Sequence, residues 1–127
     1  MIILDTNSLL RFFTNDIPKQ AKATKDLIDS ALEKTIPEVV FPELEYVLLG
    51  KNYNSSRSMV LKAFKLLISH KTINVSKEMK KAVEIYEKTK LDMADCIIAS
   101  YAFVHKGKLA SFDKELITVD LIETHWQ

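Results

Sequence analysis

The chain has 127 residues, a length typical of one compact domain, and 47% of them are apolar, which excludes a disordered chain. Its 18 Lys and Arg balance 17 Asp and Glu, so the formal net charge is +1 and any attraction to nucleic acid must come from local patches. The single cysteine excludes an internal disulfide, and no apolar run approaches the roughly 20 residues of a transmembrane helix, so we expect a cytoplasmic protein without a membrane partner.

The predicted elements begin with a short strand. Ile2-Ile3-Leu4 is an apolar run that predicts a buried strand ending at Asp5, and a first helix is expected to carry Leu9 to Phe13. Helical spacing of apolar residues then predicts helices over 19–34, over 38–51, and around 60–67, 79–86 and 94–102. Pro18 lies in the first turn of the helix over 19–34. Pro42 removes one backbone donor from the helix over 38–51 and can kink it. Ser76 is expected to cap the helix around 79–86, and Gly107 to end the last helix.

Candidate strands lie between these helices, around residues 35–36, 72–75, 109–111 and 116–119. Strands that alternate with helices favour a parallel sheet covered by helices on both faces. We therefore predict an α/β fold class with a single domain over residues 1–127. In such folds the active site lies at the carboxyl ends of the strands.

Acidic residues follow the predicted strands or begin the helices next to them. Asp5 follows the first strand, Asp113 follows the strand around 109–111, and Asp92 and Asp95 begin the helix before that strand. Glu43 lies on the helix after the second strand. Glu45 is two residues further on and must face a different side of the helix, so the two glutamates remain alternatives.

Carboxylates that converge at one end of a sheet repel one another unless a cation neutralises them. Oxygen ligands of this kind suit Mg²⁺ or Mn²⁺, and the resulting site suits phosphodiester hydrolysis. Zinc is not expected, because the three histidines and Cys96 have no ligand spacing. Asp92 and Asp95 also fit a plain helix cap, and we assign only Asp95 of the two to the metal.

These acids lie in segments that together resemble a known family. The segments are Ile3 to Phe12, which reads ILDTNSLLRF, Asn15 to Gln20 with the following Ala23, Val40 to Leu48, Leu91 to Ala99, and Ala110 to Glu115. In this order they resemble the blocks of the PIN-domain family, specifically the VapC-type toxins of VapBC toxin–antitoxin pairs. Pro42 and Glu45 depart from the second block, where the family more often has a small helix former and an apolar residue.

The resemblance implies a three-layer α/β/α fold with a central parallel sheet of about five strands. It implies an endoribonuclease that depends on Mg²⁺ or Mn²⁺ and holds the metal with Asp5, Glu43, Asp95 and Asp113. Thr6 or Asn7 would position a water molecule or one of these carboxylates. The implied partners are an RNA substrate, a second copy in a homodimer, and a cognate antitoxin protein.

Other charged residues keep two interpretations. Arg11 either contacts a substrate phosphate or a site acid, or forms a structural ion pair, and family toxins often offer an antitoxin contact there. A set of lysines forms either a basic surface for RNA or, as we expect in a nearly neutral chain, solvated helix faces. The set consists of Lys62, Lys65, Lys77, Lys80, Lys81, Lys88 and Lys90.

Three other functions compete with the nuclease. A haloacid-dehalogenase-like phosphatase also places an Asp after its first strand, but it needs a second Asp two residues on, where this chain has Asn7. A phospho-acceptor receiver domain places its Asp on a middle strand instead. A non-catalytic RNA- or protein-binding PIN module would be expected to lack one or more acids, whereas this sequence has all four. Cleavage of DNA stays open, because such a site reads phosphate.

Overall fold

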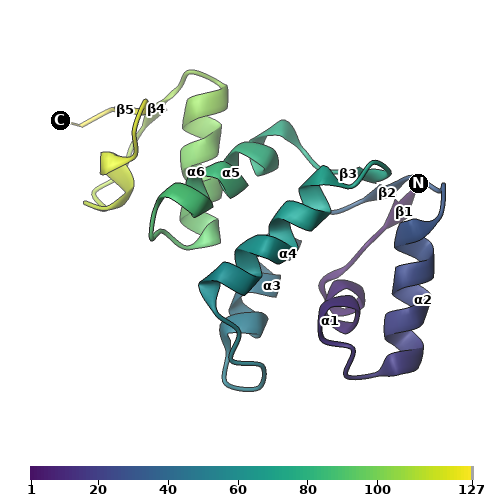
Figure 1. Ribbon diagram of the computed structural model, residues 1–127. Coiled ribbons are helices and arrows are strands. Elements are labelled where there is room, and N and C mark those ends of the chain that lie inside the picture. Colours follow the sequence, from purple (N-terminus) through teal and green to yellow (C-terminus); the bar gives the residue numbers. More distant parts are fainter. Residues whose placement is uncertain (127) are drawn as a thin grey trace. The chain divides into compact units, whose positions relative to one another are not determined.

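A computed structural model describes residues 1–126 and divides them into two compact units, the N-terminal unit of residues 1–75 and the C-terminal unit from Ser76 onward. The N-terminal unit contains three strands and four helices (Figure 1). These are β1 (Ile2–Ile3), α1 (Thr6–Thr14), α2 (Pro18–Asp29), β2 (Lys34–Thr35), α3 (Val40–Leu49), α4 (Arg57–Ser69) and β3 (Ile73–Asn74). The strands form a parallel sheet in the order β1-β2-β3, with Ile2 opposite Lys34 and Lys34 opposite Ile73.

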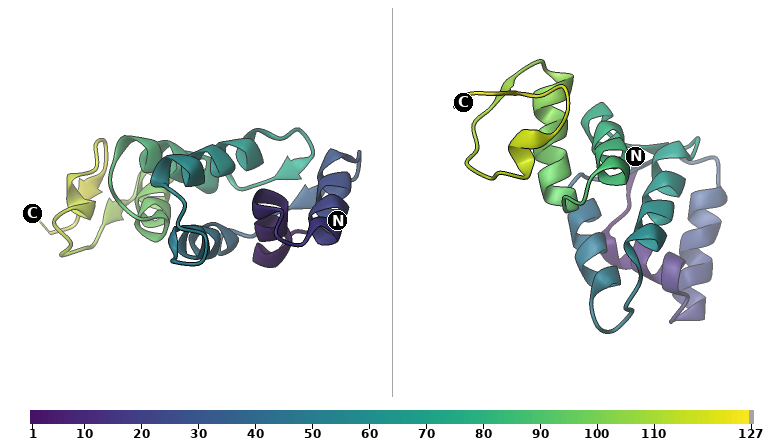
Figure 2. Two further views of the ribbon diagram at one scale, coloured as in Figure 1. Left: turned by 60° about the horizontal axis from the view of Figure 1, so that its bottom comes forward. Right: turned by 60° about the vertical axis from the view of Figure 1, so that its left-hand side comes forward.

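The C-terminal unit begins with two helices that pack against each other, α5 (Lys77–Lys88) and α6 (Met93–Val104) (Figure 2). They are followed by β4 (Lys108–Leu109), a 3₁₀ turn (Leu116–Thr118) and β5 (Glu123–Thr124). Strands β4 and β5 pair in parallel. Among the described helices, none combines the length and the apolar character that crossing a bilayer requires.

The predicted α/β class with parallel strands is confirmed, but the prediction of about five strands in one sheet is too large. The described strands form a sheet of three and a sheet of two. Each pair of neighbouring strands is joined at only two residues per strand. Most backbone hydrogen bonds of the described residues are therefore made within the helices.

Apolar burial on the helices supplies most of the core. In the N-terminal unit Phe41 of α3 and Phe64 of α4 are fully buried, with ring centroids 5.3 Å apart. In the C-terminal unit Met79 and Met93 are likewise 0% exposed. Each fully buried side chain of this size stabilises the fold by about 1.5–3 kcal/mol.

Side-chain caps begin the helices where the sequence offers them. The Ser76 hydroxyl accepts a hydrogen bond from the Met79 amide at 3.1 Å, as predicted, and Ser56 does the same for Met59. Pro42 does not disturb α3, because it is the third residue of the helix. The first-turn amides have no partner within a helix, so the missing N–H costs little there.

Helix α2 ends earlier than predicted. It stops at Asp29 instead of Lys34, and Leu32, which lies within the predicted range, is 56% exposed. Ser30 ends the helix, because its backbone N–H and its hydroxyl both donate to the Leu27 carbonyl. The chain then turns into β2.

The predicted strand around 116–119 is wrong. Leu116 to Thr118 form the 3₁₀ turn, and the last strand lies at Glu123–Thr124. The Asp113 carboxylate causes the difference, because its Oδ1 accepts hydrogen bonds from the amides of Glu115 at 2.9 Å and Leu116 at 3.2 Å. This local bonding competes with the extended backbone that the β-branched residues favour.

Gly107 does not supply the left-handed residue that ends α6. Lys106 takes that conformation, with φ 53°. The amides of Lys106 and Gly107 donate to the carbonyls of Phe103 at 3.3 Å and Ala102 at 2.9 Å. These two bonds form a Schellman motif in which the glycine lies one position later than expected.

A fully buried lysine lies on the middle strand of the three-stranded sheet. Lys34 is 0% exposed. Its Nζ donates to the carbonyls of Ile28 at 2.9 Å and Ser30 at 3.0 Å, and to the Thr72 hydroxyl at 2.6 Å. The ammonium group therefore joins β2 to the end of α2 and to the residue before β3.

Lys34→Met should lower the free energy of unfolding by about 3 kcal/mol, because it keeps the apolar stem but leaves buried carbonyl oxygens without their donor. Urea unfolding followed by circular dichroism measures this value. Lys71→Met, at an exposed neighbouring lysine, is the matched control and should leave stability nearly unchanged. Equal midpoints for the two variants would show that the buried ammonium group is not needed.

Candidate active site

Asp5 lies where β1 leads into α1 and caps that helix. Its Oδ1 accepts a hydrogen bond from the Ser8 amide at 2.9 Å. The pKa of Asp5 lies below its ordinary value, first because of this bond and then because of a bond from the Ser8 hydroxyl, with partial burial opposing both. The carboxylate is therefore held in a fixed orientation and is ionised at neutral pH.

Glu43 lies beside the residue that follows Asp5. The Thr6 hydroxyl donates to Glu43 Oε1 at 2.6 Å, across 37 positions of sequence. Asp5, Thr6, Asn7 and Glu43 line one open hollow of the N-terminal unit. Glu45 points elsewhere and is only 7% exposed. Of the two glutamates, Glu43 is thus the one that the structure brings together with Asp5.

The remaining acids belong to the C-terminal unit. Asp92 caps α6 by accepting a hydrogen bond from the Asp95 amide at 2.9 Å, the structural role expected for it. Asp113 is exposed and uses its carboxylate to start the turn before the 3₁₀ residues. Asp95 itself is half-buried in the first turn of α6.

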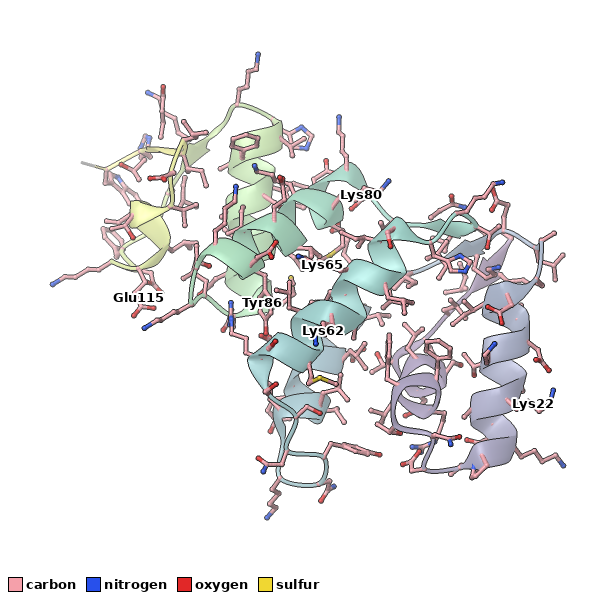
Figure 3. All side chains as sticks on the ribbon, viewed as in Figure 1. Lys22, Lys62, Lys65, Lys80, Tyr86 and Glu115 are labelled. Atoms are coloured by element: carbon pink, nitrogen blue, oxygen red, sulfur yellow. The ribbon has the colours of Figure 1, made fainter. Side chains whose placement is uncertain are left out.

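The electrostatic environment of Asp95 disfavours its charged form. Burial contributes most to raising the pKa of Asp95, followed by the negative charges of Asp92, Asp113 and Glu115. Sequence reasoning missed Glu115, which precedes the 3₁₀ turn (Figure 3). Its place two residues after Asp113 was the available signal, but only the turn brings its charge near Asp95.

The donor set suits a hard divalent cation. Each unit contributes carboxylates at the start of a helix, and oxygen donors of this type bind Mg²⁺ or Mn²⁺ rather than soft metals. Within residues 1–126 no three His, Cys, Asp or Glu side chains gather closely enough to form a metal cluster. Within the N-terminal unit the structure brings together Asp5 with Glu43, and within the C-terminal unit it brings Asp95 together with the charges around it.

Side chains that could bind softer metals have other partners. His105 Nε2 lies 2.7 Å from Glu78 Oε2 and joins the ends of α6 and α5. His70 Nδ1 accepts from the Thr72 amide at 3.3 Å. Cys96 is fully buried. These contacts give His105 and His70 partners within the protein.

Arg11 is held in a network away from the site acids. Its Nη1 donates to both carboxylate oxygens of Asp16, at 3.0 and 3.2 Å, and its Nε donates to Gln20. The Tyr53 hydroxyl also donates to Asp16, at 2.7 Å. Of the two interpretations of Arg11, these contacts favour the structural ion pair.

The lysines proposed as a basic surface belong to different parts of the fold. Lys62 and Lys65 lie on α4 of the N-terminal unit, whereas Lys77, Lys80 and Lys81 lie on α5 of the C-terminal unit (Figure 3). Lys81 is engaged within its own unit, with Nζ 3.3 Å from Glu84 and 3.8 Å from the centre of the Phe103 ring. The seven lysines are therefore not one continuous helix face.

Comparison with known proteins places the chain in a family. The family model of the PIN domain matches residues 2–121. No curated protein matches the chain. PIN domains are generally nuclease modules that commonly depend on divalent metals and bind RNA. The match runs through all five segments on which the resemblance was based, and the chain belongs to the PIN domain family.

Proposed function

We propose that the protein is an endoribonuclease that depends on Mg²⁺ or Mn²⁺ and is the toxin of a VapBC-type toxin–antitoxin pair. One observation carries the proposal. In a chain that matches the PIN domain over residues 2–121, the Thr6 hydroxyl holds the Glu43 carboxylate in the hollow that Asp5 also lines. A pair of oriented carboxylates at the end of a parallel strand is a suitable start for a metal site.

We propose that Asp5, Glu43, Asp95 and Asp113 bind the divalent cation. When bound, such an ion orients the scissile phosphate, lowers the pKa of the attacking water and offsets charge on the leaving oxygen. Asp5 supplies a carboxylate that stays ionised because Ser8 stabilises its charge. Asp95 has neighbouring negative charges that a cation would offset. This electrostatic relief supports a metal at these acids more than a neutral ligand.

Thr6 and Asn7 have supporting roles in the proposal. Thr6 is a positioning residue, because its hydroxyl fixes Glu43 Oε1 at 2.6 Å. Asn7 is exposed and lines the same hollow, where its amide can hold a water molecule or a phosphate oxygen. Tyr46, 81% exposed at the rim of that hollow, is the residue we assign to contact with a second copy or with the antitoxin.

Asp5→Asn should lower RNA cleavage by about 100-fold or more, because it removes a charged ligand and with it several kcal/mol of stabilisation of the transition state. Asparagine is also a good N-cap, so α1 should keep its start. The measurement is cleavage of labelled RNA with Mg²⁺, with Mn²⁺ and with EDTA.

The matched control is Asp26→Asn, which removes an exposed carboxylate that pairs with Lys22 on the surface of α2. It should cleave as the wild type does. Cleavage that continues in EDTA, or in the Asp5→Asn variant, would contradict the proposed site. Absence of cleavage by folded protein with metal would favour a non-catalytic binding module.

Thr6→Val should weaken Mn²⁺ binding by about 10- to 100-fold, because the glutamate loses the hydrogen bond that orients it. Thr6→Ser keeps the hydroxyl and should restore most of the affinity. Isothermal titration calorimetry with Mn²⁺ measures both, and cleavage should follow the same order. If Thr6→Val binds Mn²⁺ with the affinity of the wild type, Thr6 does not position Glu43 for metal binding.

Induced expression of the chain without its antitoxin should arrest growth of a bacterial host, because uncontrolled RNA cleavage stops protein synthesis. Asp5→Asn, expressed to the same level, should allow normal growth. Optical density after induction, with immunoblots for protein level, measures the difference. Equal growth of the wild type and the variant would contradict the toxin role. The nuclease activity would still be decided by the cleavage assay.

A further inference from the structure

Two exposed aromatic rings are stacked in the C-terminal unit. The ring centroids of Phe112 and Trp126 are 4.4 Å apart, and the ring planes differ by only 4°. Phe112 is 82% exposed and Trp126 is 47% exposed. His125 meets Trp126 nearly edge-on, with centroids 5.3 Å apart and planes at 68°. Rings of this size normally stabilise a protein by burial, and this pair contributes little to the core.

The backbone of β4 and β5 explains why the two rings meet. The strands run in parallel with Leu109 opposite Thr124, and the His125 amide extends the pairing by donating to the Leu109 carbonyl at 2.8 Å. The two chain segments therefore leave the sheet at the same end, where Phe112 and Trp126 lie side by side. This is the carboxyl end of both strands, the end at which parallel sheets place their active sites.

The stack also adjoins one of the proposed metal ligands. Asp113 follows Phe112 directly, and its backbone N–H donates to the Ser111 hydroxyl at 3.0 Å. The local turn therefore fixes the ring and the carboxylate on one short segment.

We propose that the Phe112–Trp126 stack binds an unpaired nucleobase of a single-stranded RNA substrate on the exposed ring surface that the two residues share. The inference rests on the proposed function and adds the residues that contact a base of the substrate. Stacking on aromatic side chains is the usual way in which proteins hold bases of single strands, whereas in a duplex the neighbouring base pairs cover those faces. The hollow beside Trp126 is lined by Lys108 but also by Glu123, so the rings and not the charge select the ligand.

The chain offers a specific reporter for this site, because Trp126 is its one tryptophan. Single-stranded oligoadenylate is titrated into the Asp5→Asn protein in EDTA, so that no cleavage occurs. Tryptophan fluorescence reports contact at the stack, and the anisotropy of a labelled oligoadenylate reports binding. We expect the fluorescence to be quenched along the same curve as the anisotropy, and a duplex of matched length to cause no quenching.

Substitutions at the other ring test the assignment. Phe112→Ala should weaken binding of oligoadenylate by about tenfold, and Phe112→Tyr should restore it because the ring is kept. Tyr101→Leu is the matched control, since Tyr101 is an exposed ring on α6 that stacks on His105 instead. It should bind as the parent protein does. Circular dichroism confirms that each variant is folded.

Four results would overturn the inference. Three of them are no quenching while anisotropy reports saturated binding, unchanged affinity in folded Phe112→Ala, and no binding of any RNA. Fluorescence that changes with protein concentration without RNA would show that a second copy covers the stack, and would overturn it too. Failure of the nuclease is distinguishable, because binding is measured without metal. Quenching that depends on Phe112 in a protein that never cleaves RNA would contradict the proposed nuclease function but support the proposed stacking site.

Discussion

The buried ammonium group of Lys34 is the interaction on which the N-terminal unit most depends. Its three acceptors come from the end of α2, from the residue after that helix and from the residue before β3. Strand β2 has only two residues and therefore makes few backbone hydrogen bonds to its neighbours. The hydrogen bonds of the Lys34 ammonium group attach this middle strand further. Strand β1 pairs with β2 and then delivers Asp5 to the start of α1, so the position of the first acid depends on the strand that Lys34 holds.

The proposed ligands also have structural roles as caps and turn residues. Asp5 caps α1, and Asp113 organises the turn before the 3₁₀ residues. Asp92 caps α6 and thereby places Asp95 in the first turn of that helix. Backbone amides orient the carboxylates of Asp5 and Asp113, which lowers the reorganisation that metal binding at these two residues would require. Asp95 differs, because burial first and then the negative charges of Asp92, Asp113 and Glu115 raise its pKa.

In the proposed site a divalent cation held by carboxylates would bind phosphate, which every RNA presents in the same way. Selectivity for one kind of substrate must therefore come from other side chains. In the C-terminal unit the exposed rings of Phe112 and Trp126 are flat surfaces on which a nucleobase can stack. Their chemistry differs from that of the lysines, of which Lys81 is engaged locally with Glu84 and Phe103.

Much of the fold and part of the candidate site could be predicted from the sequence. Helical periodicity indicated most helices, Ser76 was identified as a cap, and the order of the acidic segments indicated the PIN family that the family match confirms. Helix and strand ends were less predictable. Ser30 stops α2 early, Asp113 turns the 116–119 segment away from a strand, and Lys106 takes the left-handed position expected at Gly107. Each of these endings depends on a hydrogen bond that competes with local propensity.

The sequence by itself determined the residue types of the site and their order, because the chemistry of phosphate cleavage needs carboxylates and the apolar pattern places them at element ends. Only the tertiary structure decided which side chains meet. It directs Glu43 instead of Glu45 toward Thr6, pairs Arg11 with Asp16, and stacks Phe112 on Trp126. These choices depend on contacts between residues far apart in the chain or on opposite sides of a turn, and neither periodicity nor spacing encodes such distances.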